Sequence, residues 1–241
     1  MNPELSVVIA CYNEEQVLEA SVRELRDTLE NFARSYELIF VDDVSRDRTR
    51  EILARLLAEE DLPARVILHQ RNQGRGATVS DGFRAARGQI AGYLDIDLEV
   101  HCRYIPALVR AIERGADVAT VRRVYAFQLR SLDRWVLSTG YQALVRRLLA
   151  TTLQDTETGF KFFRLEALRA VLDDIKDPGW FWDTEFMLRA EREGLRIEEV
   201  PGAFVRRHDK TSTVRGLRDS LDYFRKLLAF RRRLPPARPH P

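Results

Sequence analysis

The chain has 241 residues, 45% of them hydrophobic and 32% charged, a composition typical of a soluble globular enzyme. Its 39 Lys and Arg residues nearly balance 37 Asp and Glu residues, and the net charge of +2 argues against bulk nucleic-acid binding, which usually needs a clearly basic domain. No apolar run approaches the roughly 20 residues that cross a bilayer, and the N-terminus lacks the features of a signal peptide. Cys11 and Cys102 are too far apart in sequence to suggest a disulfide framework or a zinc cluster. We therefore expect a cytoplasmic protein, at most peripheral at the inner face of a membrane.

Strand-like and helix-like segments alternate along the first half of the chain. Short apolar segments rich in β-branched residues predict buried strands over 5–10, 36–43, 64–69 and 89–97. Helical spacing of apolar residues lies between them, over 14–34, after the capping residue Asp47, and over 76–86. Strands that alternate with crossover helices predict an α/β fold with a doubly wound, mostly parallel sheet and flanking helices.

The second half is less regular. We expect a strand over 116–121, a long helix over 132–149, the short strand-like segment KFFR, a helix from Leu165, and a strand-like RIEEVP. An amphipathic basic helix is expected over 215–234, and a disordered tail over 235–241. Two alternatives remain open for this helix, namely contact with anionic lipid and docking onto the preceding domain, residues 1–214.

Polar residues collect where the predicted parallel strands end. Tyr12, Asn13 and Glu14 follow the first strand, and polar side chains also end the next three, at 42–43, 71–72 and 95–97. Ligands of open parallel sheets bind beyond the carboxyl ends of the strands. The pattern therefore predicts a binding site at this edge.

The D-x-D sequence at 95–97 is the strongest candidate for a metal site. Alternation in an extended chain would point Asp95, Asp97 and Glu99 to one side and Ile96 into the core. Such carboxylates suit Mg²⁺ or Mn²⁺, which neutralises charge on a diphosphate leaving group. The alternative is a solvated acidic strand end.

The chain resembles the family-2 glycosyltransferases with the GT-A fold, particularly the dolichol-phosphate-mannose-synthase-like, polyprenyl-phosphate glycosyltransferase branch. The resemblance runs from Leu5 to about Ser212 and rests on ordered motifs: SVVIACYNEE, VDDVSRDRT, RNQGRGATVSDGF, DIDLE, DTETGFKFFR with FWDTEFMLRAEREG, and a degenerate RRHDKTST. It implies an inverting, metal-dependent hexosyltransferase that uses a GDP- or UDP-sugar and a polyprenyl phosphate acceptor.

The resemblance also implies residue roles. The donor nucleotide sugar would contact Ala10, Tyr12, Glu14, Asp43, Asn72 and Asp95. Asp97 would hold Mg²⁺ or Mn²⁺, with Asp95 and Glu99 as partners. Arg123 and Arg207 would contact phosphates, and Asp155 would act on the acceptor.

Departures from the family pattern keep other functions open. Val44 replaces a glycine, so a turn that needs positive φ is expected to differ. Lys210 and Thr213 alter the last motif, which favours a soluble enzyme with a small hydroxyl acceptor and Asp155 or Asp183 as base. Capping of the following helix is the simpler role for Asp183. From other classes, a nucleotidylyltransferase or a non-catalytic nucleotide-sugar-binding module stays an alternative.

Overall fold

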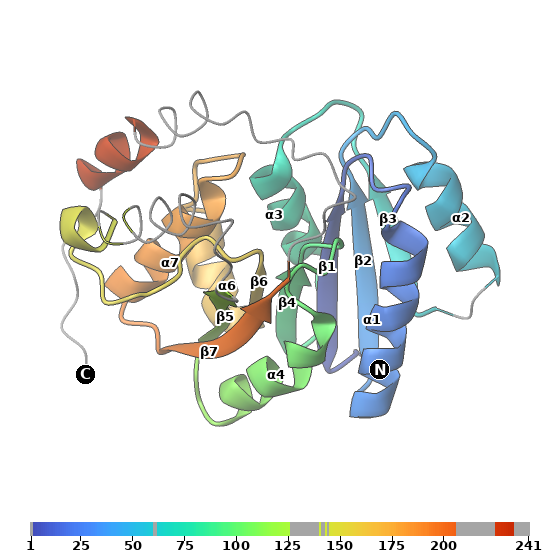
Figure 1. The fold of residues 1–241 in the computed structure, drawn as a ribbon, viewed down its shortest axis with the longest axis horizontal. Helices are drawn as coiled ribbons and strands as arrows, with labels where there is room; N and C mark the ends of the chain where they lie inside the picture. Colours follow the sequence, from blue (N-terminus) through green and yellow to red (C-terminus); the bar gives the residue numbers. More distant parts are fainter. Residues whose placement is uncertain are drawn as a thin grey trace.

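A seven-stranded mixed sheet forms the centre of the molecule (Figure 1). The computed structural model describes residues 2–59, 62–125, 140, 143, 145–205 and 225–233. The strands lie in the order β3-β2-β1-β4-β6-β5-β7. Their bounds are β1 Leu5–Cys11, β2 Tyr36–Asp42, β3 Ala64–Leu68, β4 Ile90–Leu94, β5 Val118–Tyr125, β6 Phe160–Arg164 and β7 Ile197–Phe204. Only β6 runs antiparallel to its neighbours, β4 and β5, so the predicted mostly parallel α/β fold is confirmed.

Helices cover both faces of the sheet, because alternate residues of its strands are apolar on either side. On one face, Val7 and Ile9 of β1 pack with buried residues of α1, α2 and α4. On the other face, Val8 packs with buried residues of α3, α6 and α7. The helices are α1 Leu18–Phe32, α2 Thr49–Glu59, α3 Arg75–Ala85, α4 Ile105–Glu113, α6 Leu165–Leu172 and α7 Trp182–Arg192. Figure 1 shows the resulting three layers.

The C-terminal segment 225–233 packs against α7. Leu227 and Phe230 are buried in a third cluster with Phe181 and Leu188. Lys226 pairs with Asp177 at 2.9 Å. The described part of the expected basic helix therefore docks onto the preceding domain; the rest of it and the tail lie outside the described residues.

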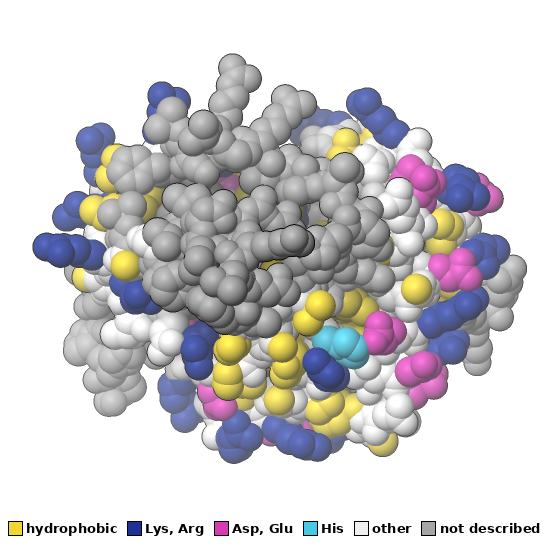
Figure 2. Space-filling view, in the orientation of Figure 1, with side chains coloured by type: hydrophobic (Ala, Val, Ile, Leu, Met, Phe, Trp, Pro, Cys, Tyr) yellow, Lys and Arg dark blue, Asp and Glu magenta, His cyan; other side chains and the backbone are white. Residues whose placement is uncertain are grey.

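The surface charge is mixed. In Figure 2 basic and acidic side chains alternate on the side of α1 and α2, whereas basic ones predominate at the opposite margin. Within the described part of the chain, no helix combines the length and apolar character needed to cross a membrane.

Candidate active site

The carboxyl ends of the parallel strands meet at one edge of the sheet. Because β6 is antiparallel, the segment that precedes it, 155–159, reaches the same edge. The backbone N–H of Asp95 after β4 donates to the Gly159 carbonyl at 2.9 Å. Two parts of the chain that the sequence singled out separately, the D-x-D and the DTETGF segment, are thus neighbours.

Asp43 organises the end of β2. Its Oδ1 lies 2.8 Å from His69 Nδ1 and accepts the Gln73 N–H at 2.8 Å, while Oδ2 accepts the Gly74 N–H at 2.9 Å. The Asn72 side-chain amide donates to the Asp43 carbonyl at 3.0 Å. The structure therefore brings Asp43 and Asn72 together, and the buried Asp43 carboxylate shapes the loop after β3.

A hollow of about 500 Å³ lies beside this loop and is lined by Leu68, His69, Gln70, Arg71 and Gln73. The predicted donor-site residues at the end of β1 are accessible to different degrees. Ala10 is half-buried, Tyr12 is 40% exposed, and Glu14 is half-buried.

The turn after β2 corrects one expectation. Val44 adopts φ +65°, so the expectation that valine would change this turn is wrong. The turn is held on both sides: Asp42 Oδ2 accepts the Ser45 N–H at 3.2 Å, and the Asp43 N–H donates to the Cys11 carbonyl at 2.9 Å. These bonds hold valine in a conformation that glycine adopts more easily.

The D-x-D sequence also differs from its predicted geometry. Strand β4 ends at Leu94, and the Leu98 N–H donates to the Asp95 carbonyl at 3.1 Å, with φ +53° at Leu98. Asp95 and Asp97 therefore lie in a turn, and the prediction that extended-chain alternation aligns their side chains is wrong. Ile96 is buried as expected.

The carboxylates of this turn fit a hard cation in chemistry. Asp97 Oδ1 accepts the Glu99 N–H at 3.3 Å. This hydrogen bond stabilises the turn and orients the Asp97 side chain. The Asp95 side chain is 43% exposed. Across the described ranges, no three His, Cys, Asp or Glu side chains are already grouped as a metal site.

Arg75 bridges two carboxylates at this edge. Its Nε and Nη2 donate to Asp95 Oδ1 at 3.0 and 2.7 Å, and its Nη1 donates to Asp183 Oδ2 at 2.6 Å. Burial disfavours the charge of Arg75, but the two carboxylates outweigh it and raise its pKa. The guanidinium also lies 5.1 Å from the ring centre of Trp180, which is 55% exposed.

Asp183 is the centre of a buried network. Its Oδ1 accepts from Lys161 Nζ at 2.8 Å and from the Tyr93 hydroxyl. Burial raises the pKa of Asp183 to about 7, although Arg75 opposes this, and burial lowers the pKa of Lys161 well below its usual range. The helix-capping interpretation of Asp183 is wrong, because its carboxylate binds these side chains and Phe181 is the N-cap residue of α7.

Neither Lys161 nor Tyr93 was predicted from the sequence as a site residue. The available signal was the lone lysine in the apolar segment FKFFR, a residue that is costly to bury without a partner. Its partner Asp183 lies 22 residues away in α7.

Arg123 and Asp155, predicted separately, pair with each other. Arg123 Nε donates to Asp155 Oδ2 at 2.7 Å and Nη2 donates to Oδ1 at 2.9 Å. Burial would raise the pKa of Asp155, but the charge and hydrogen bonds of Arg123 outweigh it and hold the pKa below its usual range. Glu199 accepts the Asp155 N–H at 2.8 Å, and burial raises the pKa of Glu199. Arg207 lies outside the described residues.

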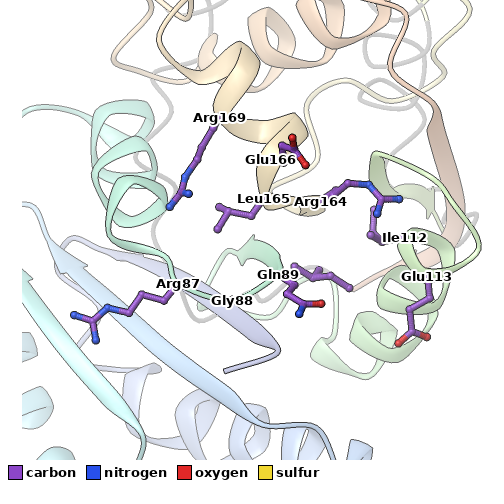
Figure 3. A pocket seen from close by; sticks show the side chains of 10 residues that line it. Arg87, Gly88, Gln89, Ile112, Glu113, Arg164, Leu165, Glu166 and Arg169 are labelled. Atoms are coloured by element: carbon purple, nitrogen blue, oxygen red, sulfur yellow. The ribbon is translucent and has the colours of Figure 1, made fainter. Parts of the chain in front are cut away.

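A second hollow, of about 610 Å³, lies at the opposite edge of the sheet. Its lining includes Ile90, where β4 begins, and Arg164, where β6 ends. Arg169 extends from α6 toward this hollow and Arg87 points away from it (Figure 3). It is separate from the carboxyl edge and shares no residue with the candidate site.

The mostly parallel sheet thus carries a D-x-D turn and arginine–carboxylate pairs at its carboxyl edge. The chain belongs to glycosyl transferase family 2, because the sequence profile of that family matches residues 6–172, more than half of the chain. It is thus a family 2 glycosyltransferase.

Several curated relatives are similar over most of the chain. Glycosyltransferase AglD of Haloferax volcanii is 40% identical over 82% of this chain and 32% of its own length. The dolichyl-phosphate beta-glucosyltransferase of Saccharomyces cerevisiae is 28% identical over 82% of this chain and 65% of its own length. An undecaprenyl-phosphate 4-deoxy-4-formamido-L-arabinose transferase of Photorhabdus laumondii is 32% identical over 70% of this chain and 51% of its own length. The matches thus span a third to two thirds of these relatives.

Solved structures confirm the fold. Glucosyl-3-phosphoglycerate synthase from Mycobacterium tuberculosis, in complex with Mn²⁺, uridine diphosphate and phosphoglyceric acid, has a TM-score of 0.72 at 21% identity, over 97% of this chain and 80% of that one. The mannosyltransferase PcManGT from Pyrobaculum calidifontis, in complex with GDP-Man and Mn²⁺, has a TM-score of 0.69 at 16% identity, over 99% of this chain and 67% of that one.

Proposed function

We propose that the protein transfers a sugar from a nucleoside-diphosphate sugar to a polyprenyl phosphate, with inversion at the anomeric carbon. The observation that carries this proposal is the buried pair of Arg123 and Asp155 at the edge of the sheet where the D-x-D turn also lies. The names of two of the relatives support the acceptor class, since they include dolichyl phosphate and undecaprenyl phosphate. Family membership argues against the nucleotidylyltransferase alternative.

The donor would bind along the ends of β1, β2 and β4. The proposed contacts are Ala10, Tyr12, Glu14, Asp43, Asn72 and Asp95. The hydrogen bonds of Asp43 to the loop after β3 support a preformed pocket wall there. The base stays open between uracil and guanine, and the two solved relatives hold UDP and GDP-Man respectively.

Asp97 would hold a divalent cation, Mg²⁺ or Mn²⁺, with Asp95 and Glu99 as partners. Hard carboxylate oxygens are suitable ligands for either ion. Two solved structures that share the fold contain Mn²⁺. When bound, such a cation stabilises the negative charge that develops on the leaving diphosphate.

The acceptor side favours a substrate that is already anionic. Two guanidinium nitrogens of Arg123 donate to the two carboxylate oxygens of Asp155. The lowered pKa of Asp155 also makes its carboxylate a weak base. A phosphate oxygen needs no general base: it attacks the anomeric carbon, the bond to the diphosphate breaks, and the nucleoside diphosphate leaves. Asp155 would position Arg123 as fixed positive charge for the phosphates, and Arg207 would add a second.

A lipid acceptor would bring the protein to a membrane surface. We propose that residues 1–214 form the catalytic domain of a cytoplasmic protein, and that the C-terminal helix contacts the inner face of the membrane. The exposed side chains of Arg225 and Arg231–Arg233 support this contact, because clustered arginines bind anionic lipid.

A transfer assay tests the proposal. Labelled UDP- and GDP-sugars are incubated with Mn²⁺ and either a polyprenyl phosphate in detergent or the corresponding polyprenol. Label should enter the organic phase only with the phosphate, should require Mn²⁺, and should be lost in Asp97→Asn but not in the exposed control Asp173→Asn. Transfer to the polyprenol or to a small hydroxyl acceptor, with none to the phosphate, would contradict the acceptor class.

A further inference from the structure

Arg75 uses different nitrogens for its two carboxylate partners. Nη1 donates to Asp183, whereas Nε and Nη2 donate to Asp95. Its side chain is only 11% exposed, so this arrangement is enclosed by protein. The guanidinium can therefore release one carboxylate and keep the other.

The contact with Asp183 is the more firmly held of the two. Asp183 is 2% exposed and is also bound by Lys161, which is fully buried. The Asp95 side chain is 43% exposed and lies on a turn at the molecular surface. The ring of Tyr93, 5.4 Å from the guanidinium carbon, further fixes Arg75 on the Asp183 side.

We propose that Arg75 is an internal counter-ion of Asp95 that a divalent cation must displace, while Asp183 retains Arg75. This inference rests on the proposed function, in which the D-x-D turn binds the cation. A fixed positive charge 2.7 Å from a carboxylate oxygen occupies that oxygen and repels a second cation. Arg75 therefore weakens cation binding to the protein without its donor. When no cation is bound, Arg75 offsets the negative charge of Asp95 in the turn.

Mn²⁺ binding to the donor-free protein tests the proposal. The concentration of free Mn²⁺ is followed by electron paramagnetic resonance in titrations of the wild type, Arg75→Met and Arg75→Gln. Because one nearby charge shifts proton binding by one to three pKa units, we expect both neutral variants to bind Mn²⁺ with a Kd at least about tenfold lower. Asp183 keeps Lys161 and Tyr93 as partners in both variants, and circular dichroism checks that they fold.

Two controls separate charge from side-chain loss. Arg75→Lys keeps a positive charge and should leave the Kd near the wild-type value. Arg87→Met removes one positive charge at the opposite edge of the sheet and should also leave it unchanged. An unchanged or higher Kd in both neutral Arg75 variants overturns the counter-ion role.

Asp97→Asn in the same titration distinguishes this inference from the function on which it rests. Loss of Mn²⁺ binding in Asp97→Asn, without tightening in the neutral Arg75 variants, overturns the counter-ion role alone. Unaltered Mn²⁺ binding in Asp97→Asn overturns the cation site itself.

Discussion

Arg123 and Asp155 join the strand β5 to the segment that precedes β6 through two parallel contacts, of 2.7 and 2.9 Å. The Asp155 side chain is 1% exposed and that of Arg123 is 16% exposed, so the pair is largely shielded from water. The Arg123 backbone N–H also donates to Asp155 Oδ2, at 3.1 Å. The pair therefore fixes the position of the Arg123 backbone and of the Arg123 guanidinium group, which is a positive charge of the candidate site.

Asp155→Asn should impair both stability and transfer. Removing one partner of a buried pair leaves the other charge uncompensated, and we expect a loss of about 3 kcal/mol in the free energy of unfolding. Urea denaturation at pH 7 measures it. Glu198→Gln, which breaks the exposed pair with Arg114, should cost less than about 1 kcal/mol. Equal losses in the free energy of unfolding of the two variants would show that the pair of Arg123 and Asp155 stabilises the fold no more than the exposed pair does.

The effect of Asp155→Asn should depend on pH. The folded-state pKa of Asp155 lies below its unfolded value of about 3.9, so its carboxylate stabilises the fold above that pH and stops doing so as the pH falls through the folded-state pKa. The stability difference between wild type and variant should stay constant from pH 7 to pH 5 and shrink below about pH 4. Urea titrations across this pH range measure the stability difference. A difference that grows in acid would show that the folded-state pKa of Asp155 is raised and not lowered.

Gly159→Ala should disturb the contact between the D-x-D turn and Arg75. A Cβ at Gly159 would lie 1.9 Å from Asp95 Oδ2 and 2.5 Å from Arg75 Nη2, so both side chains must move. We expect kcat/KM for sugar transfer to fall at least about tenfold and stability to fall by about 1–3 kcal/mol. Gly140→Ala is the control, because its Cβ would meet no atom of the described residues within 4 Å. Wild-type kinetics in Gly159→Ala would show that this close approach is dispensable.

Val44→Gly should stabilise the protein. Valine at φ +65° is strained by about 1–2 kcal/mol, which exceeds the entropic penalty of about 0.5–1 kcal/mol for glycine. Chemical denaturation should show a gain of up to about 1 kcal/mol. Val44→Ala keeps the Cβ and should gain less. A loss of stability in Val44→Gly would mean that contacts of the valine side chain outweigh its backbone strain.

The sequence predicted the sheet well where apolar runs carry the information. The strands β1 and β2 are continuous apolar segments between helical patterns, and these features indicate parallel strands without knowledge of contacts. It could not predict the direction of β6, because the five-residue segment FKFFR contains no signal for the direction in which its strand runs. It also extended β4 too far, because Ile96 continues the apolar alternation while the chain has already entered a turn.

The sequence indicated individual residues of the candidate site but not how they pair. The family resemblance pointed to Asp155 and Arg123 one at a time. Only the fold shows that the Arg123 guanidinium pairs with the Asp155 carboxylate. The link from Arg75 to Asp183 spans 108 residues, a separation at which local patterns carry no information. Lys161 was overlooked because it lies in a strand-like segment rich in phenylalanine and its partner Asp183 lies on the helix α7.

A thermal-shift titration tests the central claim, that the carboxyl edge of the sheet binds a nucleoside-diphosphate sugar with a divalent cation. UDP-, GDP- and dTDP-sugars are added with and without Mn²⁺ to the wild type and to Asp97→Ala. One nucleotide should raise the Tm by about 5–10 °C at roughly 100 times its Kd, only with Mn²⁺ and only in the wild type. An unchanged Tm with every donor, or the same rise in Asp97→Ala, would contradict the claim.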